Sequence, residues 1–229
     1  PRRKVPKGTG KPQILNTPKG PSRSLPLTHQ RSGKMKKIEF GEILNIYEYE
    51  KVREQKRREI IEIKKKRRLF VGDLVHLVFE NRDTVWFQIQ EMIRAERMVR
   101  DEEIQQEIDI YNELIPEKNQ LSITMFIEIP DEQERKRLLP QLVGIHDHLW
   151  FHIGNKHSIR AVADERSKED YQYGKAAVVH FLKLNLTPER VKDFAELPVR
   201  VEINHPNYKA MVEMPEEVKA ELVKDLQSE

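Results

Sequence analysis

The chain of 229 residues contains no cysteine. This absence excludes disulfides, thiolate metal sites, iron–sulfur clusters and thiol nucleophiles, and it favours a reducing environment. No apolar run approaches the roughly 18 residues that span a bilayer, and the N-terminus lacks the apolar core of a secretory signal. The sequence therefore predicts a cytoplasmic protein without a membrane span.

Several catalytic motifs are also absent. The chain has no HExxH helix, no GxxxxGK phosphate loop, no GxSxG elbow and no Rossmann glycine fingerprint. These absences argue against a nucleotide enzyme and against the hydrolases that carry such motifs. No cofactor is predicted, although a bound metal stays open, and the expectation leans towards a protein without catalytic activity.

The net charge of +3 is distributed unevenly. Residues 1–34 contain nine basic residues, six prolines, four glycines and no acidic residue, so we expect them to be disordered. Residues 35–229 hold the other 32 of the 41 basic residues and all 38 acidic residues, which gives the single expected domain a charge of −6. The basic segment is either an upstream extension without a role or a contact for nucleic acid.

The strongest structural pattern lies between Leu74 and Val99. Residues 74–79 form an apolar run of strand length, and the polar cluster that follows offers Asn81 or Asp83 as a helix cap. The spacing of the later apolar residues predicts a helix over residues 83–99. We expect the apolar side of this helix to pack on an antiparallel sheet.

The same patterns predict further elements along the chain. A long helix is expected first, and a shorter helix should form a hairpin with the 83–99 helix. The fold class is therefore α+β: a mostly antiparallel β-sheet packed by the N-terminal helices, with further short helices. The expected helices cover residues 40–67, 101–115, 131–143, 188–197 and 216–226, the strands 121–129 and 177–186, the hairpins 148–163 and 199–214, and a polar loop 164–176.

Two side chains are weak catalytic candidates because each lies on an otherwise apolar face. Glu96 falls near the middle of the apolar stripe of the 83–99 helix, so it must pair, reach solvent or take up a proton. An ion pair, or a helix end that has left the core, is the alternative to a functional carboxylate. His180 is either a hydrogen-bonded core residue or a catalytic one.

Two groups of polar side chains are candidate binding residues. One lies on the polar face of the 83–99 helix, where a solvated surface is the alternative. The other is a run of five cations that ends the long helix, where a favourable interaction with the helix dipole is the alternative to phosphate contact. The first group is Gln90, Arg94 and Arg97, and the second is Lys64, Lys65, Lys66, Arg67 and Arg68.

Histidines are the candidate metal ligands, because imidazole is a common ligand of zinc and similar ions. We expect three of them on one face of a strand and the fourth opposite, across a two-residue turn at Gly154-Asn155. At about 3.3 Å per residue, only His152 with His157, or His146 with His148 and Asp147, lie close enough to share an ion. Surface or cross-strand packing is the alternative. The four histidines are His146, His148, His152 and His157.

At residues 79–97, FENRDTVWFQIQEMIRAER, the chain resembles an uncharacterised bacterial family, DUF3501. The similarity continues through EEIQQEIDIYNELIP at 102–116, the 121–129 strand and INHPNY at 203–208. It spans residues 35–229 and none of the basic segment. The resemblance implies no established activity and supplies no catalytic residues.

Members of this family are often encoded beside rubrerythrin-like and iron–sulfur redox proteins. By association, the resemblance implies a non-catalytic accessory or binding protein of redox or peroxide-stress metabolism, with protein partners. Two alternatives stay open: nucleic-acid binding through the basic segment and residues 64–68, and a His-dependent metalloenzyme.

Overall fold

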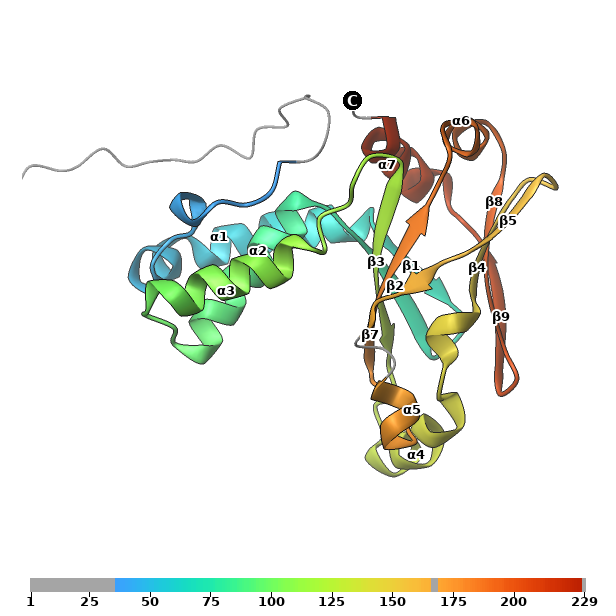
Figure 1. The fold of residues 1–229 in the computed structure, drawn as a ribbon, viewed down its shortest axis with the longest axis horizontal. Coiled ribbons are helices and arrows are strands. Elements are labelled where there is room, and N and C mark those ends of the chain that lie inside the picture. The colour runs from blue at the N-terminus through green and yellow to red at the C-terminus, as the bar shows by residue number, and fades with distance from the viewer. Residues whose placement is uncertain (1–35, 166–168, 228–229) are drawn as a thin grey trace, which may run out of the picture.

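The computed structural model describes residues 36–165 and 169–227, which form two antiparallel sheets and a layer of helices (Figure 1). The strand orders are β1-β2-β3-β7-β6 and β5-β4-β8-β9. The two sheets lie face to face, and α1, α2 and α3 extend away from the five-stranded sheet (Figure 1). The predicted α+β class, with antiparallel sheet, N-terminal helices and further short helices, is confirmed. The expected disorder of residues 1–34 lies outside the described residues.

The bounds of the elements are as follows. The helices are α1 (Ile46–Lys65), α2 (Arg82–Glu96), α3 (Asp101–Asn112), α4 (Glu132–Leu138), α5 (Glu169–Tyr173), α6 (Pro188–Glu196) and α7 (Glu216–Gln227), with 3-10 turns η1 (Phe40–Glu42), η2 (Leu139–Leu142) and η3 (Ile145–His148). The strands are β1 (Arg68–Val71), β2 (Val75–Glu80), β3 (Gln120–Ile127), β4 (Leu149–Ile153), β5 (His157–Arg160), β6 (Val162–Ala163), β7 (Val179–Asn185), β8 (Val199–His205) and β9 (Tyr208–Glu213). In the part of the chain described here, no helix has the length and apolar character to cross a membrane.

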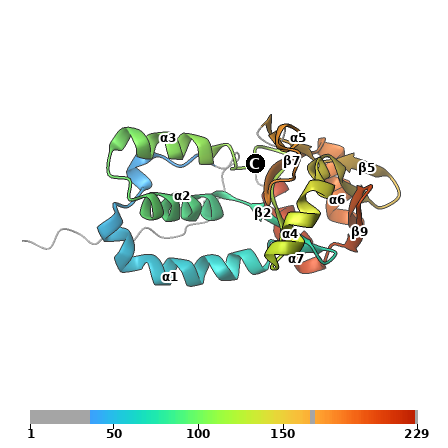
Figure 2. The same ribbon diagram turned by 90° about the horizontal axis from the view of Figure 1, so that it is seen from below.

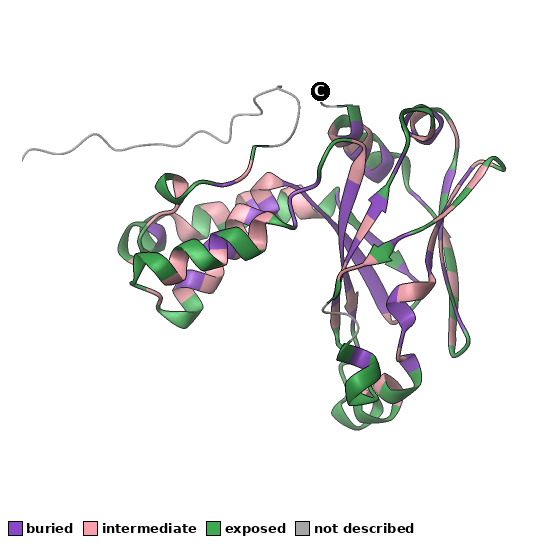
Figure 3. Ribbon diagram, in the orientation of Figure 1, coloured by how far each residue is buried: buried purple, intermediate pink, exposed green. Residues whose placement is uncertain are grey.

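The facing sides of the two sheets form the main core. Phe79 of β2 meets Phe151 of β4 edge to face, with ring centroids 6.3 Å apart, and neither ring is exposed. Burial of each such side chain stabilises the fold by roughly 1.5–3 kcal/mol. Figure 3 shows buried residues concentrated along the strands. The apolar run of residues 74–79 and the predicted hairpin of residues 148–163 therefore contribute strands to this core.

Tyr208 joins the two sheets at one end. Its hydroxyl donates to the Val71 carbonyl oxygen at 2.7 Å and accepts from the Leu74 backbone N–H at 3.1 Å. Gly72, in the turn between these two residues, has φ +73°, and a Cβ there would lie 2.4 Å from the Tyr208 hydroxyl oxygen. This turn therefore needs glycine for its backbone conformation and for the space that the phenol occupies.

A second, smaller core lies within the helical layer. In Figure 2, α2 runs between α1 and α3. The predicted hairpin of α2 with α3 is confirmed, but the expected packing of the apolar side of α2 on the sheet is wrong. That side contacts the other helices and the residues just before α1, such as Ile38, because the sheet surface next to α2 is polar. The buried residues of this core are Ile38, Val85, Ile89, Ile93, Ile108, Leu114 and Ile115.

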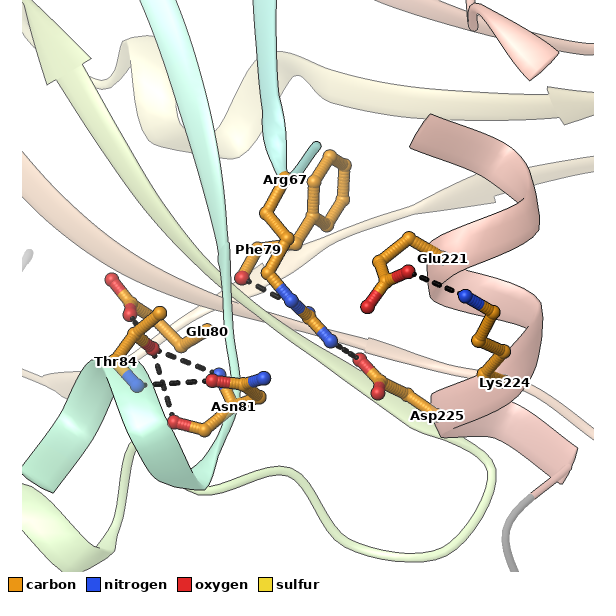
Figure 4. Close-up of polar contacts among 8 residues, drawn as sticks. All are labelled: Arg67, Phe79, Glu80, Asn81, Thr84, Glu221, Lys224 and Asp225. Carbon is orange, nitrogen blue, oxygen red and sulfur yellow. Dashed lines mark hydrogen bonds and ion pairs between the residues drawn. The ribbon is translucent and has the colours of Figure 1, made fainter. Parts of the chain in front are cut away.

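The polar junction between α2 and the sheet is centred on Glu80, the last residue of β2 (Figure 4). Glu80 is 2% exposed. Its carboxylate accepts hydrogen bonds from the Thr84 hydroxyl at 2.5 Å, the Thr124 hydroxyl at 2.6 Å and the Gln88 side-chain amide at 2.9 Å. A buried carboxylate is tolerated when several donors satisfy it. Glu80 thereby ties the start of α2 to β3.

Two helix boundaries differ from the sequence expectation. The long helix expected over 40–67 is divided: η1 stands alone, and α1 starts after Asn45, whose side chain accepts from the Glu48 N–H at 2.9 Å. The 83–99 helix ends at Glu96, because Arg97 adopts a left-handed conformation with φ 53°. Asn81 caps its start, as one of the two expected caps.

The hairpin of β4 and β5 has a different register from the expected one. Ile153 pairs with His157, and His152 pairs with Ser158. The turn therefore spans three residues, with Gly154 at φ +53°, and not two. Since neighbouring residues of a strand point to opposite faces, this shift of one residue places His152 and His157 on opposite faces of the sheet.

Candidate metal centre

Three buried polar side chains from different parts of the chain meet at one end of the space between the sheets. His146 lies in η3, Asp170 in α5 and His180 in β7, and they are 2%, 3% and 1% exposed. Each offers a donor atom, and the three donor atoms lie within 4.8 Å of one another. His180 occupies the inward face of β7 that it shares with Leu182 and Leu184, so strand alternation aims it into this space.

The separations suit a single metal ion. Asp170 Oδ2 lies 3.4 Å from His146 Nδ1 and 3.5 Å from His180 Nε2. Two atoms bound to one ion at about 2.1 Å, with a tetrahedral angle, are about 3.4 Å apart. Two histidines and one carboxylate form a donor set that binds Fe(II) and Zn(II) and leaves further coordination positions open.

The donor atoms lack other partners in the described structure. His146 Nδ1, Asp170 Oδ2 and both ring nitrogens of His180 are buried and make no hydrogen bond with the described residues. Each such atom costs about 1–3 kcal/mol when it is left unpaired. An ion bound by His146 Nδ1, Asp170 Oδ2 and His180 Nε2 would satisfy three of these four atoms. Buried unpaired atoms aimed at one point are therefore the observation that distinguishes this cluster.

Neighbouring groups orient two of the donors. Asp170 Oδ1 accepts a hydrogen bond from the Ala177 N–H at 2.8 Å, which turns Oδ2 towards the histidines. His146 Nε2 lies 3.6 Å from Asp147 Oδ2, on the side of the ring away from the cluster. A carboxylate behind a metal-binding histidine fixes the orientation of the ring.

Burial prepares His180 for metal binding. Its removal from water lowers the pKa of His180, and the nearby His146 lowers it further, while the Asp170 carboxylate raises it. The neutral imidazole is the form that binds a metal. At neutral pH His180 therefore presents a lone pair and not a positive charge.

A cavity of approximately 390 Å³ adjoins the cluster. It is lined by His146, Asp147, Ala163, Asp164 and Tyr171, whereas Asp170 and His180 do not line it. The Tyr171 hydroxyl donates to Asp147 Oδ2 at 2.9 Å, and its ring meets His146 edge to face at 5.9 Å. Burial, and then this bond to Asp147, raise the pKa of Tyr171. The volume falls in the usual range for a small-molecule site.

Gly144 provides the space for Tyr171. Its backbone has φ +81°, and a Cβ there would lie 2.4 Å from the Tyr171 hydroxyl oxygen. The chain can thus place η3, with His146 and Asp147, directly beneath the phenol. Glycine at this position fits both the left-handed conformation and the close approach.

The sequence identified two of the three donors for other reasons. It placed His146 on a strand with His148, but both lie in the 3-10 turn η3. It singled out His180 separately, and it missed Asp170 because residues 164–176 looked like an undifferentiated polar loop. Part of that segment is the short helix α5, which carries Asp170 and Tyr171. Only the packing of η3, α5 and β7 brings the donors together, and no spacing along the chain signals it.

The other histidines have partners of their own. His152 contacts the Ser158 hydroxyl at 2.8 Å and Glu202 at 2.7 Å, on the outer face of the four-stranded sheet. His157 contacts Asp193 at 2.8 Å, and the register of β4 and β5 does not bring it together with His152 as the sequence suggested. The ring of His148 lies edge to face with that of His205, at 5.1 Å. His157, Glu189 and Asp193 form a second group of possible ligands, but Asp193 already bonds to His157 and Lys156.

The candidate binding face of α2 is largely covered by the N-terminal part of the domain. Gln90 is 1% exposed and makes two hydrogen bonds to the backbone of Leu44. Arg94 pairs with Glu50 of α1. Arg97 and Glu96 are exposed. Glu96 therefore lies where the helix has left the core, which was one of the alternatives to a functional carboxylate.

The run of cations from Lys64 to Arg68 does not form one surface. Arg67 is 1% exposed and inaccessible to a phosphate, because it bonds to the Phe79 carbonyl oxygen at 3.2 Å and to Asp225 of α7 (Figure 4). Lys65, Lys66 and Arg68 are exposed, and Lys64 is half-buried. The part of the nucleic-acid hypothesis that concerns residues 1–34 falls outside the described residues.

Comparisons with known proteins give a family and a structure of the same architecture. A family model described as "Protein of unknown function (DUF3501)" matches residues 37–226. A crystal structure of a protein of unknown function from Burkholderia pseudomallei K96243 has a TM-score of 0.78 and 30% identity, over 84% of this chain and 100% of that chain. No curated protein matches the chain significantly. The resemblance inferred from the sequence motifs is confirmed.

Proposed function

The chain belongs to the DUF3501 family, and we propose that it is a mononuclear metalloprotein that binds one divalent transition-metal ion through His146, Asp170 and His180. The observation that carries this proposal is the set of buried donor atoms without hydrogen-bond partners. Polar atoms buried in this way are rare in folded proteins and call for a specific explanation, such as an ion.

The number of protein ligands indicates what the ion would do. Three protein ligands leave positions for water or for a small molecule, and catalytic sites differ from structural ones in keeping such a position open. A bound divalent ion lowers the pKa of its water and polarises a ligand oxygen. Asp147 and Tyr171, joined by a hydrogen bond, lie behind the His146 ring and would hold this ligand in its orientation. We therefore favour metal-assisted chemistry on a small ligand over a purely structural ion.

Metal titration of the full chain tests the proposal. The chelator-treated protein should bind one Co(II), Zn(II) or anaerobic Fe(II) ion per chain, measured by calorimetry and by elemental analysis after desalting. Asp170→Asn and His180→Gln should each weaken binding by at least tenfold, because each removes one of three ligands. Full stoichiometry and affinity in both variants would contradict the assignment.

The second group of possible ligands supplies a matched control. His157→Gln alters a histidine that also lies near carboxylates, but its Nε2 already has a hydrogen-bond partner in Asp193. This variant should retain the affinity of the wild type. Loss of the ion in His157→Gln alone would move the metal site to His157, Glu189 and Asp193 and would overturn our choice.

An accessory role in redox or peroxide-stress metabolism, in the cytoplasm and with protein partners, stays a prediction. It is supported by the donor set, because two histidines and a carboxylate suit ferrous iron. If it is correct, Fe(II) bound to the wild type should be oxidised by hydrogen peroxide faster than Fe(II) added to Asp170→Asn, which can be followed by ferric absorbance. Equal rates would remove this support.

A further inference from the structure

Three aromatic rings lie in a row across the outer face of the five-stranded sheet, the face opposite to the one that forms the core. Phe70 of β1 pairs in register with His76 of β2, which pairs with Phe126 of β3. The His76 ring stacks on Phe126 with centroids 4.7 Å apart and an interplanar angle of 13°. The Phe70 ring lies 5.6 Å from His76 on the other side. The strand register thus builds a row of rings three strands wide.

The row is accessible at its ends. Phe70 is 57% exposed and Phe126 is half-buried, whereas His76 between them is only 4% exposed. The helical layer meets this face of the sheet at the other end of β2, where β2 leads into α2 (Figure 1). An exposed phenylalanine on an open sheet face leaves an apolar ring surface in water, and covering it is favourable.

Cations flank the row on one side. Arg68 precedes Phe70 by two residues, so its side chain leaves the same face of β1. Burial has the largest effect on the pKa of His76 and lowers it. Glu128 raises this pKa, and Arg68 and then Lys64, in the last turn of α1, lower it further. On the other side, Glu128 lies 3.4 Å from His76 Nδ1 and is 62% exposed. An anionic ligand is therefore favoured along the Arg68 side of the rings.

We propose that this face binds single-stranded nucleic acid, with bases stacked on Phe70 and Phe126 and phosphates in contact with Arg68 and Lys64. Aromatic rings on an open sheet face, next to basic side chains, are the features by which sheet-based domains hold unpaired bases. The site is separate from the metal centre, and either can be absent without the other.

Fluorescence anisotropy of the full chain with a labelled 12-residue oligothymidylate tests the proposal. Phe70→Ala should weaken binding by about fivefold or more, because stacking of a base contributes roughly that factor or above. Raising salt from 50 to 200 mM should weaken wild-type binding by about sevenfold or more if at least two phosphates are neutralised. Arg68→Gln should weaken binding and reduce this salt dependence.

A control variant at the opposite end of α1 from Lys64 keeps the test specific. Tyr47 of α1 is 73% exposed and also lies beside a cation, with Lys51 Nζ 3.9 Å from its ring centroid. Tyr47→Ala should leave the affinity within twofold of the wild type. Near-ultraviolet circular dichroism of each variant shows whether the fold is retained.

Three results would overturn the proposal. Unchanged affinity in both Phe70→Ala and Arg68→Gln would assign all binding to the basic segment. Equal or tighter binding of a 12-base-pair duplex would exclude stacking, because paired bases cannot reach the rings. Self-association that Phe70→Ala abolishes, without measurable oligonucleotide binding, would show that a second copy of the chain covers this face.

Discussion

Replacing His180 by leucine should have opposite effects on stability in the absence and in the presence of metal. In the metal-free protein, His180 buries two ring nitrogens without hydrogen-bond partners in the described structure, on a face that it shares with Leu182 and Leu184. A buried unpaired polar group costs about 1–3 kcal/mol, and leucine has a similar volume and no polar atom. With chelator present, we therefore expect His180→Leu to raise the free energy of unfolding by about 1–3 kcal/mol.

With metal present, the order of stabilities should reverse. An ion that binds only the folded wild type stabilises it by about 2.7 kcal/mol at a concentration 100 times the Kd. His180→Leu keeps two of the three ligands and should gain much less. The wild-type Tm should rise by about 5–10 °C on addition of metal, since 1 kcal/mol corresponds to about 2–4 °C for a domain of this size.

Urea unfolding and thermal scans, each run with chelator and with excess Co(II) or Zn(II), measure both effects. His157→Leu is the control, because it breaks the bond to Asp193 and should destabilise the protein equally in both conditions. A loss of more than about 2 kcal/mol in chelator-treated His180→Leu would refute the reasoning, because it would mean that His180 is already satisfied without an ion. A metal effect of equal size in wild type and His180→Leu would refute it as well.

Three further outcomes follow from the structure. Glu80→Ala should lower the free energy of unfolding by about 3–5 kcal/mol in urea titrations, because two buried hydroxyl donors and the half-buried Gln88 amide lose their acceptor. A loss below about 1 kcal/mol would show that the α2 junction does not depend on Glu80. Burial, and then Lys37, lower the pKa of Lys183 from 10.5 to about 8, so the folded protein binds fewer protons than the unfolded one between those values. The stability of the wild type relative to Lys183→Met should therefore rise as the pH increases from about 8 to 10.5, and a flat difference would contradict the burial of the amine. Gly144→Ala should lower the free energy of unfolding by at least about 1–2 kcal/mol, because alanine is strained at this positive φ. Adding Tyr171→Phe removes the hydroxyl that the new Cβ would meet, so the double mutant should recover only the part of the loss that comes from this clash, as a double-mutant cycle measures.

The sequence predicted the elements well where one physical signal dominated. Alternation located β3, β8 and β9, and the asparagine cap located the start of α2, because both are local effects of backbone geometry. The predicted register of the β4–β5 hairpin was wrong because a glycine in a turn is compatible with loops of two or three residues, and the local sequence does not decide between them. The partner of α2 was wrong for a similar reason: an apolar stripe specifies burial but not what covers it. Here Glu80 and Thr124 make the nearby sheet surface polar, so the other helices cover the stripe.

Burial and hydrogen bonding separate two groups of ligand-type side chains that the sequence could not rank. His157 and Asp193 satisfy each other near the surface, with Lys156 as a further partner, so they gain little from an ion. His146, Asp170 and His180 are more deeply buried, and their facing atoms are unpaired. A fold can retain that cost only if other interactions exceed it, or if a ligand removes it. An N/O donor set also needs no cysteine, so the absence that excluded thiolate sites at the outset leaves this kind of metal centre open.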